Sequence, residues 1–203
     1  MLGVLIEKAL TTPEYYPLSL NAVVMACNQK NNRAPVVSYG ETEVVDALDA
    51  LREKRLVAMV TEAGARVPKY RQLAAEQIGL DEKDIAIMAE LLLRGSQTPG
   101  ELRNRADRMA AFADLAQVQT ILDALAVRQA PLVVRLPRQP GMKECRYTHL
   151  LSGPVQISED NEAPAPVEPA RVALSADRER IAALEREVAA LREEWAIFKK
   201  QFE

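Results

Sequence analysis

The sequence predicts a mostly helical α+β protein in which a module of three helices and a β-hairpin occurs twice, followed by a linker and a C-terminal coiled-coil helix. Three short matches in the same order indicate the duplication. They pair residues 10–13 with 96–99, residues 48–51 with 122–125, and residues 69–71 with 146–148. The chain has 203 residues, of which 48% are hydrophobic and 27% charged, as is typical of a globular protein.

Each copy begins with a helix whose apolar residues recur at helical spacing. These residues are Leu2, Leu5 and Ile6 in the first copy and Ile85, Met88, Leu91 and Leu92 in the second. The next helix of each copy has a capping residue, because Ser19 precedes residues 20–28 and Thr98 precedes Pro99. A third helix then buries one stripe of side chains. The stripes are Val44, Leu48 and Leu51 in the first copy and Leu115, Val118, Leu122 and Leu125 in the second.

A β-rich run follows each third helix, at residues 56–60 and 132–136, and a Gly-containing turn separates it from a second strand. Three helices followed by a β-hairpin is the order of a winged helix-turn-helix, in which the hairpin covers one end of a small helical core. We therefore predict winged-helix modules at residues 1–77 and 78–151, with Asp81 as the N-cap that opens the second.

The rest of the chain predicts a linker and a coiled coil. Residues 152–171 are acidic and rich in proline, which predicts a flexible linker. Residues 172–203 contain an apolar heptad repeat, which predicts a coiled-coil helix. Its a and d positions are Ile181, Leu184, Val188, Leu191, Trp195, Phe198 and Phe202.

The charges that flank the heptad seam favour a parallel homodimer. In a parallel dimer each g residue faces the partner's e residue, and all three such pairs are opposite in sign. The pairs are Arg180–Glu185, Glu187–Arg192 and Glu194–Lys199. The alternative is a single amphipathic helix that folds back onto a winged module.

Composition and motifs exclude several classes of function. With Cys27, Cys145 and His149 as the only residues of their types, a disulfide framework and a Cys/His zinc site are excluded. No phosphate-binding loop or nucleophile elbow occurs, so we expect neither an enzyme nor a cofactor. The chain has no apolar run of membrane-spanning length and no signal peptide, so we expect a cytoplasmic protein with no membrane partner.

Four segments resemble the YceH-like family of bacterial proteins. Residues 11–21 (TTPEYYPLSLN) and 26–33 (ACNQKNNR) are similar to the first module of that family, and residues 91–103 (LLLRGSQTPGELR) and 146–150 (RYTHL) to the second. The likeness covers nearly all of residues 1–153. It implies a tandem winged-helix fold in a cytoplasmic bacterial protein, and it implies no particular activity, ligand or catalytic residue.

The second module is predicted to contact double-stranded DNA. Its third helix presents Gln117 and Thr120, whose side chains can read base edges. Seven cations nearby are suited to phosphate contacts. They are Arg103, Arg105 and Arg108 on the second helix and Arg135, Arg138, Lys143 and Arg146 on the hairpin. The net charge of −3 excludes a strongly basic binder but leaves room for a local basic face.

The third helix of the first module is unsuited to DNA. Opposite its core stripe it presents Glu43, Asp46, Ala50 and Glu53, and carboxylates repel phosphates. Two function hypotheses therefore stay open. The first is a dimeric DNA-binding regulator that uses the second module, and the second is a non-enzymatic adaptor whose winged modules bind another protein.

Overall fold

The structure is a computed structural model that describes residues 1–61, 67–139, 141–142 and 144–155. All described residues belong to one compact unit, which runs from Met1 to Glu159. The predicted coiled coil lies outside the described residues, as does most of the predicted linker.

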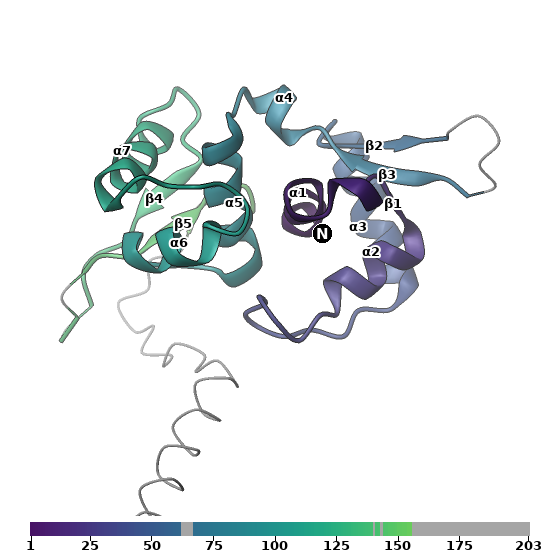
Figure 1. Cartoon of the computed structure of the whole chain (residues 1–203), viewed down its shortest axis with the longest axis horizontal. Coiled ribbons are helices and arrows are strands. Elements are labelled where there is room, and N and C mark those ends of the chain that lie inside the picture. Colours follow the sequence, from purple (N-terminus) through teal and green to yellow (C-terminus); the bar gives the residue numbers. More distant parts are fainter. Residues whose placement is uncertain (62–66, 140, 143, 156–203) are drawn as a thin grey trace, which may run out of the picture. The chain divides into compact units, whose positions relative to one another are not determined.

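The elements from α1 to β3, here called the first module, occupy one side of this unit (Figure 1). In chain order they are α1 (Leu2–Thr11), the 3-10 helix η1 (Pro13–Tyr15), β1 (Leu18–Ser19), α2 (Leu20–Cys27), α3 (Glu41–Glu53), β2 (Val57–Val60) and β3 (Lys69–Gln72). The strands form an antiparallel sheet in the order β1-β3-β2, with Tyr70 opposite both Leu18 and Met59. Ser19 caps α2 by accepting a hydrogen bond of 3.4 Å from the Ala22 N–H, which confirms the predicted cap.

A short helix, α4 (Ala74–Ile78), leads to the elements from α5 to β5, here called the second module. These are α5 (Glu82–Arg94), α6 (Pro99–Ala106), α7 (Leu115–Ala126), β4 (Val133–Arg135) and β5 (Tyr147–His149). Strands β4 and β5 are antiparallel, and an isolated bridge joins Gln97 to Tyr147. Because β1 likewise pairs with β3 in the first module, the second module repeats the order of elements of the first.

The predicted helix caps of the second module are confirmed. Asp81 accepts a hydrogen bond of 2.8 Å from the Asp84 N–H, which starts α5. Thr98 and Glu101 form a reciprocal capping box at the start of α6, with hydrogen bonds of 3.2 and 3.0 Å. These interactions depend on residues three positions apart, and for that reason sequence spacing alone predicts them.

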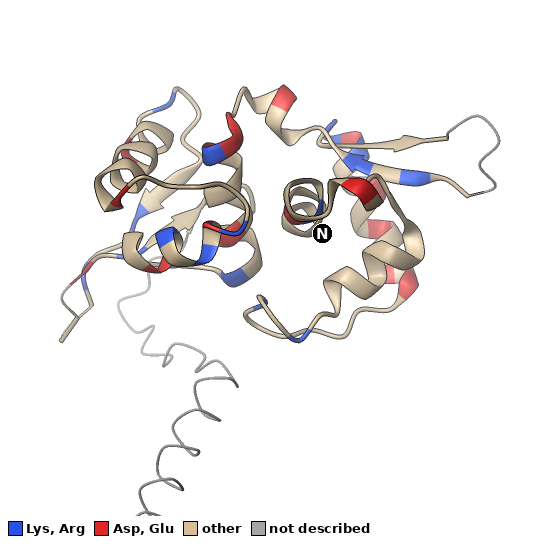
Figure 2. Ribbon diagram, viewed as in Figure 1, with Lys and Arg blue, Asp and Glu red and all other residues tan. Residues whose placement is uncertain are grey.

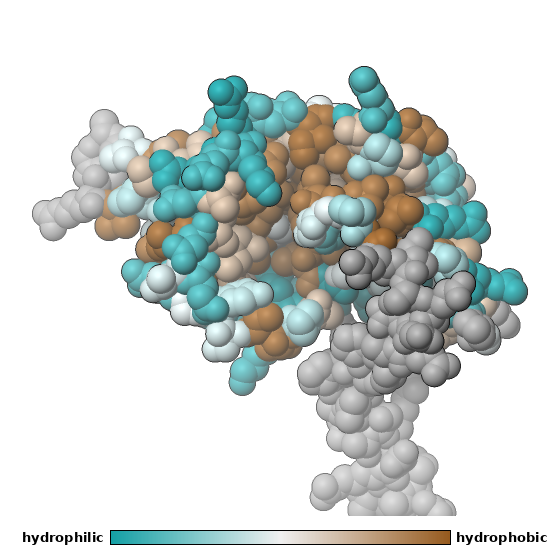
Figure 3. All heavy atoms as spheres, turned by 180° about the vertical axis from the view of Figure 1, so that it is seen from behind, coloured by the Kyte–Doolittle hydropathy of each residue, from teal (hydrophilic) through white to brown (hydrophobic). Residues whose placement is uncertain are grey.

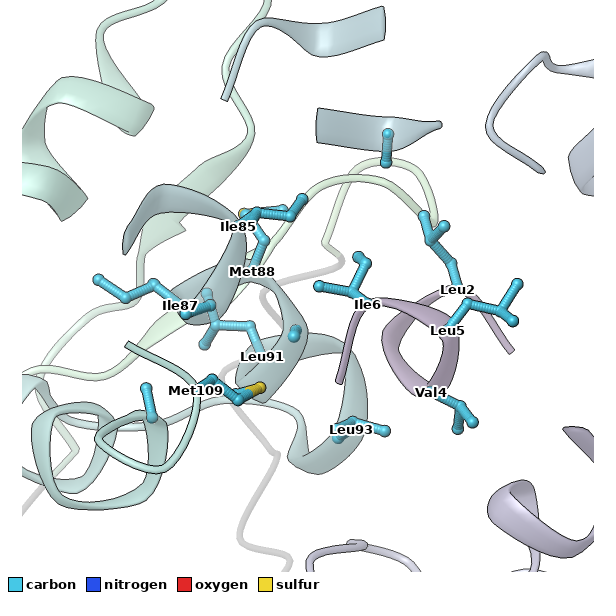
Figure 4. Close-up of a cluster of buried hydrophobic side chains, with 14 of the residues drawn as sticks. Leu2, Val4, Leu5, Ile6, Ile85, Ile87, Met88, Leu91, Leu93 and Met109 are labelled. Atoms are coloured by element: carbon cyan, nitrogen blue, oxygen red, sulfur yellow. The ribbon is translucent and has the colours of Figure 1, made fainter. Parts of the chain in front are cut away.

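Helix α5 is the centre of the unit. The sequence predicts one apolar stripe on this helix, but the structure buries residues on all of its faces. Helix α1 covers one side of α5, while α6 and β5 cover others. Figure 4 shows Ile6 of α1 pointing toward Met88 and Leu91 of α5. Gly3 permits this close approach, because a Cβ atom at Gly3 would lie 2.8 Å from the Cβ atom of Leu92.

The stripes predicted for the third helices are right except at one position. Val44 and Leu48 of α3 are fully buried, as are Val118 and Leu122 of α7. Leu115, predicted to belong to the core, is 45% exposed. It is the first residue of α7, directly after the exposed N-cap Asp114, and it therefore lies beyond the edge of the core although its spacing fits the stripe.

Candidate functional site

A cluster of buried charges lies where the first helices of the two modules meet. Glu7 of α1 is 1% exposed and Glu90 of α5 is fully buried. Arg33 binds Glu7 through both terminal guanidinium nitrogens, at 2.6 and 3.1 Å. Arg108, which follows α6, binds Glu7 at 2.7 Å and Glu90 at 2.5 Å. The Nε atom of Arg94 lies 3.2 Å from Glu90. Two buried carboxylates are thus held by three arginines, which we call the charged cluster.

The electrostatics of the charged cluster favour the ionised forms of Glu7 and Arg108. Burial by itself raises the pKa of the Glu7 carboxyl, but the hydrogen bonds and charges of Arg33 and Arg108 exceed that effect and hold the pKa below its usual range. Burial by itself lowers the pKa of Arg108, and the two glutamates outweigh it and raise that pKa. The carboxylates and guanidinium groups therefore depend on one another, since each would be costly to bury alone.

The loop between α2 and α3 is fixed to the end of α5 by the same cluster. Arg94 donates a hydrogen bond of 2.7 Å to the Asn32 side chain, and the Ala34 N–H donates one of 3.0 Å to the Leu93 carbonyl. Arg33 also donates to the Ala26 carbonyl at 2.8 Å. A loop of the first module is thereby attached to the central helix of the second.

Three of the arginines predicted to contact DNA have partners within the protein. Arg108 belongs to the charged cluster. Arg105 donates a hydrogen bond of 2.8 Å to the buried side chain of Gln97 and lies 3.6 Å from Glu101. Arg146 binds Glu101 at 2.7 Å and the Ser96 carbonyl at 3.1 Å. Each of these three guanidinium groups is therefore paired with a carboxylate, and Figure 2 shows acidic and basic positions interspersed along the second module.

The other predicted phosphate contacts lie on the surface. Arg103 on α6 and Arg138 beyond β4 are exposed. Arg135 is exposed as well, and it donates a hydrogen bond of 3.2 Å to Sγ of Cys145. Lys143 lies outside the described residues. Within the described part of the second module, these three arginines are the predicted phosphate contacts that are exposed and bind no carboxylate.

The two residues predicted to read bases line an open groove between the start of α5 and α7. Thr120 is exposed, while the Oε1 atom of Gln117 accepts hydrogen bonds of 3.2 Å from Lys83 and 3.0 Å from the Ala113 N–H. Asp81 and Glu82 line the same groove. Gln117 is thus held by the protein itself, and the carboxylates beside it would repel a phosphate backbone.

The exposed face of α3 is acidic, as predicted. Glu43, Asp46, Ala50 and Glu53 are all exposed, and so is Asp49. The Glu43 carboxylate accepts a hydrogen bond of 2.7 Å from the Gly40 N–H and caps the helix.

Two exposed apolar side chains that sequence spacing did not single out lie on α2 and just before α3. Met25 of α2 is 67% exposed, and Tyr39, just before α3, is 38% exposed. The Asn28 side chain, one helical turn after Met25, hydrogen-bonds both the N–H and the carbonyl of Tyr39, at 2.7 and 2.8 Å, and so holds the backbone before α3 against the end of α2. Apolar surface also occurs elsewhere, near the centre of the rear face (Figure 3).

Two kinds of feature are absent from the residues that the structure describes. These residues include no group of three or more His, Cys, Asp and Glu side chains that could hold a metal ion, and no helix of the length and apolarity that a membrane span needs. Cys27 is buried and Cys145 is half-buried. His149 is half-buried, and burial lowers its pKa.

Comparison with known proteins gives consistent matches. A family model described as a protein of unknown function, DUF480, matches residues 1–142. A UPF0502 protein of Geobacter sulfurreducens is 56% identical over 191 residues, which cover 94% of this chain and 86% of that relative. A UPF0502 protein of Geotalea uraniireducens is 53% identical over 210 residues, covering 100% of this chain and 95% of the relative. A UPF0502 protein of Opitutus terrae is 52% identical over 167 residues, which cover 82% of this chain and 73% of that relative. The resemblance to YceH-like bacterial proteins agrees with these matches.

Proposed function

From the premise that this chain belongs to the DUF480 family of bacterial proteins of unknown function, we propose that it is a non-enzymatic protein-interaction adaptor built from two winged-helix modules. The order of helix, helix, helix and β-hairpin in each module supports the winged-helix assignment. The winged-helix assignment and the predicted cytoplasmic location together favour another soluble protein as the partner.

The charge of the two third helices carries this proposal. In most winged helices that bind DNA, the third helix enters the major groove. Helix α7 contains no Lys or Arg. Helix α3 contains only Arg52, which is paired with Asp49 at 2.6 Å, beside the other carboxylates of its exposed face. Neither helix offers a free cation to a phosphate backbone, whereas both offer surfaces that a protein could bind.

The connection between the modules supports an adaptor. The apolar contact of α1 with α5 and the charged cluster join the modules within one compact unit. A partner bound to one module is then held at a fixed distance from the surface of the other. Such fixed geometry suits a protein that brings two others together.

Site-specific photocrosslinking in cells tests the proposal. A photoreactive amino acid replaces Ala50 at the centre of the exposed face of α3, and in the control it replaces the exposed Glu76 of α4. We expect a protein adduct of discrete mass at position 50 and none at position 76. No adduct at position 50, together with discrete genomic peaks when the tagged protein is crosslinked to DNA, would overturn the proposal.

The second candidate function is a DNA-binding regulator. The specific observation in its favour is the exposure of Arg103, Arg135 and Arg138 on the second module. These arginines could contact phosphates and Thr120 could contact a base edge. Discrete genomic peaks that disappear when the three arginines are replaced by alanine would establish it.

Both functions include a parallel homodimer formed by residues 172–203. Replacing Leu184 and Leu191 with aspartate would place charges in the heptad seam. We expect the full-length variant to have half the mass of the wild type by light scattering. An unchanged mass would favour the alternative in which this segment folds back onto a module.

A further inference from the structure

The sheet of the first module has an open edge at β2. Its strand order is β1-β3-β2, so β3 pairs with one edge of β2 and Figure 1 shows β2 as the outer strand. The Leu73 N–H donates to the Leu56 carbonyl at 2.7 Å, which makes these two residues a hydrogen-bonded pair in the register of β2 and β3. Such pairs alternate along an antiparallel ladder. Ala58 and Val60 therefore bond to β3, whereas the N–H and the carbonyl of Met59 are directed away from it.

These two backbone groups of Met59 have no partner in the described part of the chain. Backbone groups along the edge of a sheet are a template for the strand of another chain, and proteins often block such an edge with a charged residue, a proline or a bulge. Strand β2 has the sequence Val-Ala-Met-Val, without charge or proline, and it pairs with β3 without a bulge. This edge is therefore able to accept a further strand.

An apolar row on one face of the sheet ends at the same residue. Leu18 of β1, Tyr70 of β3 and Met59 of β2 lie opposite one another across the three strands. Leu18 is 6% exposed and Tyr70 is 7% exposed, whereas Met59 is 44% exposed. Side chains that lie opposite one another stabilise a sheet, and Met59 has such a neighbour on one side only. The exposed side chain of Met59 and its unpaired backbone groups thus indicate the same place for a fourth strand.

The other face of the sheet is basic beside β2. Lys69 and Arg71 alternate with the buried Tyr70 along β3 and therefore lie on the face opposite the apolar row (Figure 2). Glu76 lies 3.5 Å from Arg71, but the side chains of both are exposed, so the pair is weak. A strand added beyond β2 would lie about 10 Å from β3, a distance that a glutamate and an arginine or lysine can span together.

We propose that the open edge of β2 binds an extended segment of a partner protein, in which apolar and acidic residues alternate, as an added antiparallel strand. Its backbone pairs with Met59 and its apolar side chains continue the row that ends there. Its carboxylates face Lys69 and Arg71. The inference rests on the proposed adaptor function and names the chemistry of one partner. Backbone hydrogen bonds supply affinity in strand addition, while the alternate side chains and their charge supply specificity.

The test uses the full-length protein and a fluorescent synthetic peptide of about seven residues, the length of an ordinary strand, in which glutamate and valine alternate. A residue bonded to Met59 in an antiparallel pair has its side chain on the same face as Met59. The valine N–H groups should therefore point toward β2 and the glutamate N–H groups away from it. One control peptide carries N-methyl groups on its valines, and a second carries the same number on its glutamates.

We expect the unmethylated and glutamate-methylated peptides to bind the wild type. The valine-methylated peptide should bind at least about tenfold more weakly, because it lacks the donors to β2. Met59→Pro removes the outward N–H at a position where an edge strand tolerates proline, and it should weaken binding about tenfold. Met59→Lys keeps the N–H but places a charge at the end of the apolar row, and it should weaken binding likewise.

A charge variant and its matched control complete the test. Lys69→Gln/Arg71→Gln should weaken binding of the unmethylated peptide about fivefold to tenfold. Arg103→Gln/Arg138→Gln makes the same change in net charge at exposed positions of the second module and should bind the peptide as the wild type does.

The inference is overturned if valine methylation weakens binding no more than glutamate methylation, if both Met59 variants bind the peptide as the wild type does, or if the two charge variants bind it equally. It is also overturned if the wild type binds no peptide and Met59→Pro lowers the assembly mass, which would identify a second copy of this chain as the occupant of the edge. If position 50 crosslinks to a protein while the peptide fails to bind, strand addition is wrong and the adaptor function stands. If neither occurs, both fall.

Discussion

Arg108 and Glu7 form an ion pair of 2.7 Å although they lie 101 positions apart in the sequence. The pair joins the first helix of the first module to the end of α6 in the second. Arg108 also binds Glu90, so one guanidinium group connects a carboxylate of α1 with a carboxylate of α5.

Replacing Glu7 with glutamine should destabilise the protein. The substitution keeps the shape of the side chain but leaves Arg33, which is 6% exposed, without its buried counterion. We expect the free energy of unfolding to fall by about 3–5 kcal/mol in urea titrations. Glu76→Gln is the control, because the side chain of Glu76 is 65% exposed and that of its partner Arg71 is 42% exposed, and a change within about 0.5 kcal/mol is expected there. Equal effects of the two substitutions would show that the charged cluster adds no stability.

The contribution of Glu7 should depend on pH. Because its pKa in the folded protein is below that of an unfolded glutamate, about 4.3, the ionised carboxylate stabilises the fold above that pH. The stabilisation is lost as the pH falls from about 4.3 through the lower folded pKa. The difference in unfolding free energy between the wild type and Glu7→Gln, measured from about pH 7 to 3, should be constant at first and then narrow below about pH 4.3. If the difference in unfolding free energy between the two proteins instead narrows as the pH rises, the lowered pKa of Glu7 is contradicted.

Gly3→Ala should weaken the contact between α1 and α5. The new Cβ would lie 2.8 Å from the Cβ of Leu92 and 3.3 Å from the Ala89 carbonyl, so the helices must separate. We expect a net loss of about 1–3 kcal/mol despite the better helix propensity of alanine. Gly100→Ala is the matched control, since its Cβ would meet only the Thr98 hydroxyl at 3.9 Å, and a small gain in melting temperature is expected there. A gain in melting temperature for both variants would mean that α1 does not pack this tightly against α5.

The exposed arginines of the second module should control any DNA binding. Replacing Arg103, Arg135 and Arg138 with alanine should reduce the slope of log K against log salt by roughly 2–3, measured by fluorescence anisotropy on duplex DNA. The stability of that variant should be unchanged, because none of the three arginines is buried. Arg108→Ala should instead lower stability, since it removes a partner from two buried carboxylates. No duplex binding by the wild type at low salt would remove the DNA-binding candidate.

Features that depend on neighbouring residues were predicted from the sequence. The caps at Ser19, Asp81 and Thr98 and the acidic face of α3 each depend on positions a few residues apart. The spacing of apolar residues predicted the buried faces of α3 and α7, and it failed at Leu115 because periodicity does not show where a core ends.

The charged cluster was missed, although the sequence contains a signal for it. Glu7 follows the apolar run from Val4 to Ile6, and Glu90 precedes the run from Leu91 to Leu93. A carboxylate inside an apolar helical stretch indicates burial and hence a cationic partner. The sequence offers no means of choosing Arg33, Arg94 and Arg108 among its many arginines.

Capping, periodicity and turn chemistry act over a few residues, so the sequence predicted the three helices and the β-hairpin of each module, whereas η1, β1 and α4 were not predicted. Only the tertiary structure decided what the charged side chains do. Arg103 and Arg108 lie five positions apart, had the same predicted role and are both exposed, yet of the two only Arg108 binds two buried glutamates. The difference arises because an unpaired carboxylate is costly to bury. The packing of α1 on α5 places Glu7 and Glu90 within reach of Arg108 but not of Arg103.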